Sequence, residues 1–194
     1  YITTKYINIR GFNMGKLDNL GAIVTGAAEG IGEAIALELA SNGAKVACVD
    51  FNEESGSNTA NKIIESGGEA TFIKTDISDP DQVKKMVNSS VEFLGSIDIL
   101  VNNAAKFTFG AVEDVSQEEW EDILKVNVIG YSTCVKEALP HLKKSGKSAV
   151  VNLASVSSLI AGPKFVPYNT SKGAVLMLTR SLSVDLAEYG IRVN

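Results

Sequence analysis

The chain of 194 residues has a single histidine and only two cysteines. One histidine cannot build a zinc site based on several imidazoles, and His141 lies in a basic segment, ALPHLKKSG, that is typical of a helix end. Cys48 and Cys134 lie far apart in apolar surroundings. We therefore expect two buried thiols, no disulfide and no metal site.

Long hydrophobic runs and an excess of positive charge are also missing. No segment reaches the roughly 18 uncharged apolar residues that would cross a bilayer, and the first residues lack the pattern of a secretory signal. The chain has 18 Lys and Arg against 23 Asp and Glu, a formal net charge of -5. A nucleic-acid surface needs a basic stripe, which is absent. The sequence predicts a cytoplasmic protein that binds neither membranes nor nucleic acids.

Short apolar runs alternate with longer helical patterns from residue 21 onward. Strands are expected at 22–25, 45–50, 69–75, 97–102 and 148–155, and helices at about 30–42, 53–66, 80–94, 117–139 and 166–189. Continuous apolar runs are typical of strands that are covered on both faces. The alternation predicts right-handed βαβ units, and hence an α/β protein with a doubly wound parallel sheet as the middle of three layers.

The boundaries of the domain can also be estimated. Residues 1–17 precede the first strand and are expected to be an N-terminal extension or remnant. Residues 18–194 contain no linker rich in Pro or Ser and are expected to form one domain. The closing GIRVN follows a helix-ending glycine, Gly190, and resembles the beginning of a further strand. We expect the sheet to lack its last strand or strands.

The loop after the first strand reads TGAAEGIG and leads directly into a helical pattern. Gly26 would permit the tight turn, Gly30 would let the backbone approach a phosphate, and Gly32 would allow close packing of helix on strand. The helix N-terminus offers free N–H groups and a positive dipole end to a pyrophosphate. The pattern favours a Rossmann-like dinucleotide site, with Glu29 and Ile31 as further contacts, although a glycine-rich turn alone can be only a turn.

An acidic residue at the end of the second predicted strand indicates which dinucleotide would bind. Asp50 lies eighteen residues beyond Gly32, where this fold places a carboxylate that holds the ribose hydroxyls. Glu29 in the loop, and Phe51 and Asn52 after the acid, provide no cation for a 2′-phosphate, which a carboxylate would repel. The sequence predicts NAD, with Phe51 as a further contact, and disfavours NADP; an ordinary surface aspartate remains the alternative.

Further strand ends add weaker signals. Asp76 and Ile77 follow the third strand, where they could touch an adenine ring, and NNAA follows the fourth, with Asn103 as a candidate cofactor contact. A turn-forming Asp and a loop Asn are common, so neither is specific by itself. Ser155 follows the fifth strand, at the edge where ligands bind in such sheets.

The stretch YNTSK places Lys172 four residues after Tyr168, at the start of the last predicted helix. The two side chains therefore share one helical face. The same spacing occurs in YITTK, from Tyr1 to Lys5. That pair precedes every strand, and no role is expected for it.

Together these motifs resemble the classical short-chain dehydrogenases/reductases. TGAAEGIG, NNAA, the asparagine of VNVIG (Asn127), Ser155 and YNTSK occur in that family's order and at its separations, over residues 18–194. The resemblance implies an oxidoreductase that transfers a hydride between a secondary alcohol or ketone and nicotinamide. It also implies a homotetramer joined through the last two long helices. Ala105 stands where the family commonly has glycine, which could narrow the cofactor pocket.

The resemblance also assigns roles. Tyr168 would be the general acid/base, Lys172 would support it and contact the nicotinamide ribose, Ser155 would donate to the substrate oxygen, and Asn127 would hold a water near Lys172. A free phenol ionises near pH 10, so a cation one turn away is needed to favour phenolate near neutral pH. The alternative is that Asn127 is only a polar residue that interrupts a helix, but an amide on an apolar stripe needs a partner, which favours the functional role.

Other functions remain open. These are a non-catalytic nucleotide-binding Rossmann protein, an NADP-dependent carbonyl or 3-oxoacyl reductase of the same family, and a piece that turns over nothing. An epimerase or dehydratase of the extended branch is disfavoured, because its glycine spacing is G-x-x-G-x-x-G. The segment VSSLIAGPKFVP predicts a small apolar alcohol or ketone as substrate, through Leu159, Ile160, Pro163 and Phe165.

Overall fold

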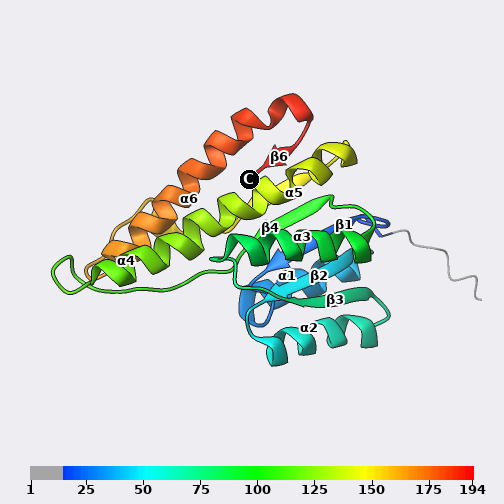
Figure 1. Cartoon of the computed structure of the whole chain (residues 1–194), viewed down its shortest axis with the longest axis horizontal. Coiled ribbons are helices and arrows are strands. Elements are labelled where there is room, and N and C mark those ends of the chain that lie inside the picture. Colours follow the sequence, from blue (N-terminus) through cyan, green and yellow to red (C-terminus); the bar gives the residue numbers. More distant parts are fainter. Residues whose placement is uncertain (1–14) are drawn as a thin grey trace, which may run out of the picture.

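The computed structural model describes residues 15–194 and contains one parallel sheet of six strands. The strands are β1 (Gly21–Thr25), β2 (Lys45–Asp50), β3 (Glu69–Lys74), β4 (Ile99–Asn102), β5 (Ala149–Asn152) and β6 (Arg192–Val193). Their order in the sheet is β3-β2-β1-β4-β5-β6 (Figure 1). The chain reverses direction across the sheet between β1 and β4, so the predicted Rossmann-like, doubly wound fold is confirmed.

Helices cover both faces of this sheet. They are α1 (Gly30–Ser41), α2 (Glu53–Glu65), α3 (Pro80–Leu94), α4 (Gln117–Leu124), α5 (Tyr131–Ser145) and α6 (Val166–Asp185). Alternate residues of each strand point to opposite faces: Ile23 packs with α3, α5 and α6, whereas Val24 packs with α1 and α2. The three layers that the sequence predicts are therefore present.

Local turn chemistry sets where several helices begin and end. The Asp79 side chain accepts hydrogen bonds from the first N–H groups of α3, and Ser116 and Glu119 form a reciprocal capping box at α4.

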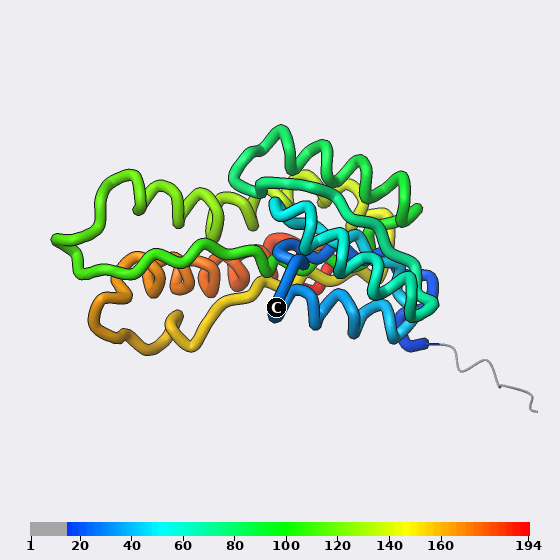
Figure 2. The backbone as a smooth tube through the Cα atoms, turned by 90° about the horizontal axis from the view of Figure 1, so that it is seen from below, coloured from blue at the N-terminus to red at the C-terminus, as the bar shows by residue number. Residues whose placement is uncertain are grey.

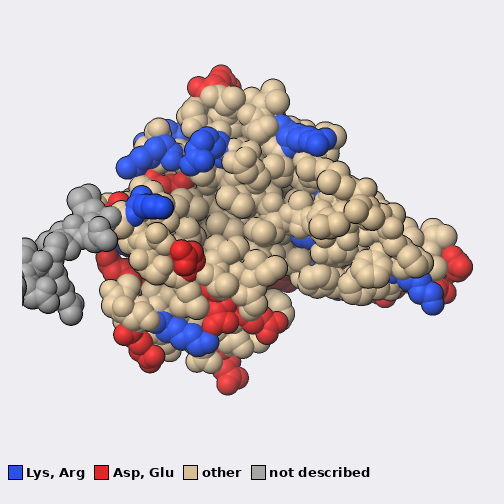
Figure 3. Space-filling model, turned by 180° about the vertical axis from the view of Figure 1, so that it is seen from behind, with Lys and Arg blue, Asp and Glu red and all other residues tan. Residues whose placement is uncertain are grey.

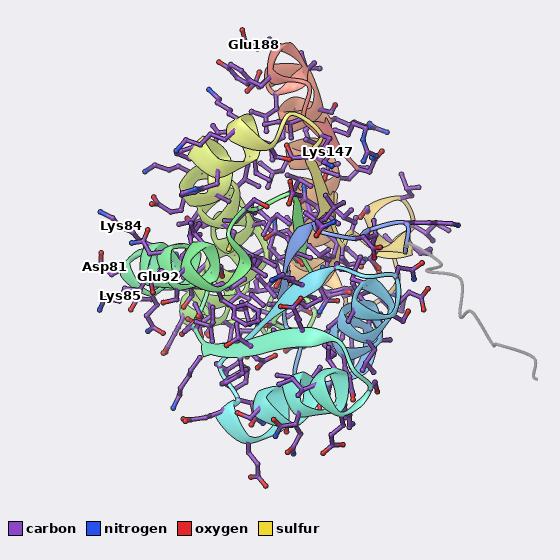
Figure 4. All side chains as sticks on the ribbon, turned by 90° about the vertical axis from the view of Figure 1, so that its right-hand side faces the viewer. Asp81, Lys84, Lys85, Glu92, Lys147 and Glu188 are labelled. Atoms are coloured by element: carbon purple, nitrogen blue, oxygen red, sulfur yellow. The ribbon has the colours of Figure 1, made fainter. Side chains whose placement is uncertain are left out.

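The outer face of α3 carries Asp81, Lys84, Lys85 and Glu92, which point away from the sheet (Figure 4). An amphipathic helix with one solvated face is the expected outcome of this pattern.

The helix expected at 117–139 differs from the prediction. It continues to Ser145, and its middle, Lys125–Gly130, is a π-helical turn between α4 and α5. At this turn the backbone at Gly130 lies close to Ile77, because a Cβ there would come 3.0 Å from the Ile77 carbonyl oxygen. A wider turn in mid-helix commonly accompanies a functional site.

The packed domain begins before residue 18. Leu17 packs against the cluster on the α1 and α2 face, and its N–H donates to the Asn42 carbonyl at 2.9 Å. Residues 15–17 thus belong to the domain, although the sequence assigned them to an extension. Residues 1–14, including the YITTK pair, lie outside the described residues.

The loops after β4 and β5 project with α4 and the start of α6 to one side of the molecule (Figure 2). Helices α1 and α2 lie on the other side. Within residues 15–194, no helix is long and apolar enough to cross a membrane. The same residues contain no group of three or more acidic, His or Cys side chains that could hold a metal ion.

Candidate active site

The glycine turn has the geometry that its sequence predicts. Gly26 and Gly30 have positive φ angles of 66° and 59°, which side chains rarely tolerate. A Cβ at Gly26 would lie 2.7 Å from Ala104, whereas one at Gly30 would meet nothing within 4 Å. Gly32 packs directly against the Gly26 carbonyl. The turn is therefore closed on its inner side and open above Gly30, where a phosphate could approach the backbone.

Two residues at the carboxyl ends of the adjacent strands β1 and β4 hold this turn in place. The Asn103 side chain donates to the carbonyls of Thr25 and Gly26, each at 3.0 Å. The Thr25 hydroxyl accepts from the Asn103 backbone N–H at 3.0 Å. Both donor hydrogens of the Asn103 side chain are thus used in hydrogen bonds to this loop. Thr25 was not identified from the sequence, where a Thr at a strand end carries no specific signal.

Asp50 connects the end of β2 with the same turn. One carboxylate oxygen accepts from the Ala28 N–H and the other from the Asn52 N–H, each at 3.0 Å. A carboxylate has about four acceptor sites, so both oxygens can still accept from hydroxyl groups. Glu29 and Ile31 are exposed on the rim of the turn, as a cofactor contact requires.

A cleft of about 600 Å³ lies between the segment after β3 and the segment after β4. Its lining includes Phe51, Asp76, Ile77, Ala104, Ala105 and Phe107. The first three were predicted as cofactor contacts, and the cleft brings them together. Ser155, Tyr168 and Lys172 do not line it. The cleft therefore gathers only part of the predicted site, and Phe107, which stacks on Tyr168, belongs to its lining.

Lys172 is the most unusual charged residue of the site. Its side chain is buried, with 3% of the residue exposed, and its Nζ donates to the Leu153 carbonyl at 2.6 Å. The ammonium also lies 5.6 Å from the ring centroid of Tyr131, within the range of a cation–π contact. Burial lowers the pKa of Lys172 to about 8. The lysine predicted from sequence thus points inward, to the carboxyl end of β5.

Ser155 is linked to Lys172 through the turn that follows β5. The Ser155 hydroxyl accepts from the Ser157 N–H at 3.1 Å, and the Ser158 hydroxyl donates to the Lys172 carbonyl at 2.7 Å. The turn that carries Ser155 is thereby fixed to the helix that carries Lys172. Among residues 15–194 the Ser155 hydroxyl donates no hydrogen bond, so its hydrogen could be donated to a ligand.

Asn127 lies in the π-helical turn and is fully buried. Its side chain accepts from the Lys106 N–H at 2.8 Å and donates to the Lys106 carbonyl at 3.0 Å. It also donates to the Ser171 hydroxyl at 3.0 Å, and Ser171 donates in turn to the Tyr168 carbonyl at 2.8 Å. The amide joins the loop after β4 to the first turns of α6. Ser171, which sequence reasoning missed, is the connecting residue.

The Tyr168 ring is half-buried among phenylalanines. It stacks on Phe107 with the ring centroids 5.1 Å apart and the planes 20° apart. Phe109 and Phe165 lie at 5.7 and 6.5 Å from the same ring. Phe165 was predicted near the substrate, whereas Phe107 and Phe109 were missed; the stretch KFTFG after NNAA was the available signal.

Comparisons with known proteins indicate the family of the chain. The family model described as short chain dehydrogenase matches residues 21–194. An uncharacterized oxidoreductase of Thermotoga maritima is 44% identical over 172 residues, which cover 89% of this chain and 68% of that protein. Cyclopentanol dehydrogenase of Comamonas testosteroni is 35% identical over 181 residues, with 93% and 72% covered.

A solved structure has a similar fold. Carveol dehydrogenase from Mycobacterium avium in complex with NAD has a TM-score of 0.89 at 29% sequence identity. The match covers 93% of this chain and 70% of that one. The sheet order, the glycine turn and the matched family model lead to one conclusion: the chain belongs to the short-chain dehydrogenase family.

Proposed function

We propose that the protein is an NAD-dependent oxidoreductase that interconverts secondary alcohols and ketones, with Tyr168 as general acid/base. The observation that carries this proposal is the position of Lys172. Lys172 follows Tyr168 by one turn of α6. Its ammonium is buried at the carboxyl end of β5, where it donates to the Leu153 carbonyl. A buried cation without a structural ion pair is costly, and among residues 15–194 Lys172 forms no salt bridge with a carboxylate.

The residues of the glycine turn fit a dinucleotide. The open space above Gly30 and the N-terminus of α1 suit a pyrophosphate, and the free acceptor sites of Asp50 suit ribose hydroxyls. Nicotinamide, when bound, accepts or supplies the hydride. We infer NAD because the carboxylate of Asp50 would repel a 2′-phosphate. The relative whose structure is described in complex with NAD supports this inference.

The chain's own residues would handle the proton. During oxidation, Tyr168 as phenolate would take the proton of the substrate hydroxyl, and during reduction it would return it. Lys172, one helical turn after Tyr168, would support this proton transfer through its positive charge. Ser155 would donate a hydrogen bond to the substrate oxygen and hold it beside the phenol. Asn127, through Ser171, would hold the first turn of α6 in register.

The experiment that tests this proposal compares Tyr168→Phe with the wild type on a panel of secondary alcohols, followed through nicotinamide absorbance. We expect at least about a 100-fold loss of kcat, while the dissociation constant for NAD changes by less than about threefold. Tyr189→Phe is the matched control, because its ring lies at the far end of the last helical segment, beside Lys143. An undiminished rate in Tyr168→Phe would remove the catalytic assignment.

We also propose that copies of the chain associate through the outer faces of α5 and α6. Met177 and Val184 on α6 are 57% and 76% exposed, and apolar side chains on a helix surface favour association with another surface. The family resemblance suggests a tetramer. Light scattering of the purified protein would decide this, and a monomer at all concentrations would exclude it.

A further inference from the structure

Four aromatic rings form a continuous row at the mouth of the candidate site. Phe107 stacks on Tyr168, Phe109 lies 5.7 Å from Tyr168, and Phe109 lies 4.6 Å from Phe165 with a tilt of 54°. The rings come from the loop after β4 and from the start of α6, which are separated by about 55 to 60 residues of sequence. We call Phe107, Phe109 and Phe165 the aromatic wall.

The aromatic wall is not buried by the described residues. Phe107 and Phe109 are 60% and 53% exposed, and Leu159 and Ile160 nearby in the chain are 78% and 66% exposed. Exposed large apolar side chains in a cluster mark a binding surface. Seen from behind, the projecting part of the molecule is largely free of charged side chains except at its tip (Figure 3). The exposed rings of the wall therefore suit an apolar part of a ligand.

A backbone connection holds the two halves of the wall together. Gly110 and Phe165 form a parallel β-bridge, and the Gly110 N–H donates to the Lys164 carbonyl at 2.7 Å. Lys164 has a positive φ of 62°, which is unfavourable for a residue with a Cβ. Strain of this kind persists where the surrounding contacts require one conformation. The spacing of the rings is thus set before any ligand binds.

We propose that the aromatic wall is a binding site for the aryl group of a secondary alcohol or aryl ketone, whose reacting carbon then lies beside Tyr168. This inference rests on the proposed function and names its substrate class. An aromatic ligand gains from offset-stacked or edge-to-face contacts with rings at 4.5–7 Å, beyond the burial of apolar area. A saturated ring of the same size gains binding free energy only from the burial of apolar area.

The test uses two alcohols that differ only in the ring, 1-phenylethanol and 1-cyclohexylethanol. We expect the wild type to prefer the aryl alcohol in kcat/KM, and Phe107→Leu to reduce that preference by about three- to tenfold. Leucine keeps apolar volume and removes the ring. Phe93→Leu is the matched control, because Phe93 is 37% exposed near the C-terminal end of α3, which precedes β4, whereas Phe107 lies in the loop that follows β4.

A binding measurement separates the possible outcomes. Saturation-transfer NMR should show acetophenone bound to the wild type and to Phe93→Leu, and bound more weakly to Phe107→Leu. Oxidation of alcohols without an aryl preference would overturn this inference and leave the proposed function intact. No turnover with any alcohol would overturn the proposed function, and acetophenone binding that depends on Phe107 would still support the wall. If Phe107→Leu changes the oligomeric state instead of the preference, the wall is a contact between copies and the inference is wrong.

Discussion

Burying a lysine costs folding free energy unless its ammonium finds partners, and Lys172 shows this at the residue scale. Burial lowers its pKa from 10.5 to about 8. A difference of this size between the folded and unfolded states corresponds to on the order of 3 kcal/mol. Because the folded state binds the proton less tightly than the unfolded state, the full cost applies below pH 8. The cost is relieved as the pH rises from 8 to 10.5.

Replacing this lysine should therefore stabilise the protein while it abolishes activity. We expect Lys172→Met to raise the free energy of unfolding at pH 7 by about 1–3 kcal/mol, with the lost hydrogen bond to Leu153 as an offset. The gain should shrink between pH 8 and 10.5, where the wild-type lysine is already neutral. Urea unfolding of both proteins over this pH range measures it. A gain that does not depend on pH would contradict the account.

The buried hydroxyl of Tyr131, whose ring lies near the Lys172 ammonium, is a second group that lowers the stability of the folded state. The residue is fully buried, and among residues 15–194 its hydroxyl has no hydrogen-bond partner. Burial raises its pKa, and Cys134 and Tyr168 add smaller contributions. An unpaired buried hydroxyl costs about 1–3 kcal/mol.

Removing only this hydroxyl should help folding. Tyr131→Phe is expected to raise the free energy of unfolding by about 1 kcal/mol. It should leave kcat unchanged, because the ring near Lys172 is kept. Denaturant unfolding and steady-state kinetics of the variant test both statements. A less stable variant would show that the hydroxyl is paired in solution.

At the scale of elements, the π-helical turn shows how a helix serves the site. Both Asn127 and Gly130 lie within this turn. The Asn127 side chain forms hydrogen bonds with the loop after β4, and the backbone of Gly130 lies against Ile77. The apolar spacing of this segment predicted an uninterrupted helix. A period of 3.6 residues and a local widening look alike over six residues, so the pattern could not reveal the turn.

The N-terminus of α1 allows a matched pair of glycine variants. In Gly32→Ala the new Cβ meets the Gly26 carbonyl and the Asn103 side chain. We expect a loss of more than about 2 kcal/mol in stability. In Gly30→Ala the space is open, so only the positive φ is penalised, by about 1 kcal/mol. NAD affinity should still fall at least about tenfold, because the methyl group occupies the side from which a phosphate approaches.

Chemical denaturation and titration with NAD separate the two glycine effects. Equal losses of stability in both variants would contradict the observed packing. Unchanged NAD affinity in Gly30→Ala would place the pyrophosphate elsewhere.

At the scale of the whole molecule, binding of the cofactor should raise the free energy of unfolding. A ligand that binds only the folded state adds about 2.7 kcal/mol at 100 times its dissociation constant. We expect NAD to raise the melting temperature more than NADP at equal concentration. Asp50→Asn should narrow the difference between the two, because it removes the negative charge while an amide oxygen can still accept from Ala28.

Asp185→Asn, an exposed substitution at the end of α6, is the control for that comparison. Thermal unfolding of the three proteins with each dinucleotide gives the answer. Greater stabilisation of the wild type by NADP would show that Asp50 does not select the cofactor.

Much of this protein was determined by sequence alone. The order and type of the elements, the caps at Asp79 and Ser116, and the left-handed glycines of the first loop all follow from apolar periodicity and turn chemistry. These signals act over a few residues, so they can be read without knowing the rest of the chain. The family resemblance rests on the same local motifs.

Tertiary structure alone decided which loops meet. The parallel register of β1, β4 and β5 places Asn103 against Thr25 and brings Leu153 to the ammonium of Lys172. It also brings the loop after β4 to the start of α6, where Phe107 meets Tyr168. Such contacts join residues from about 20 to about 80 positions apart, and no local pattern encodes them. They depend on strand order and on the packing of the helices over the sheet.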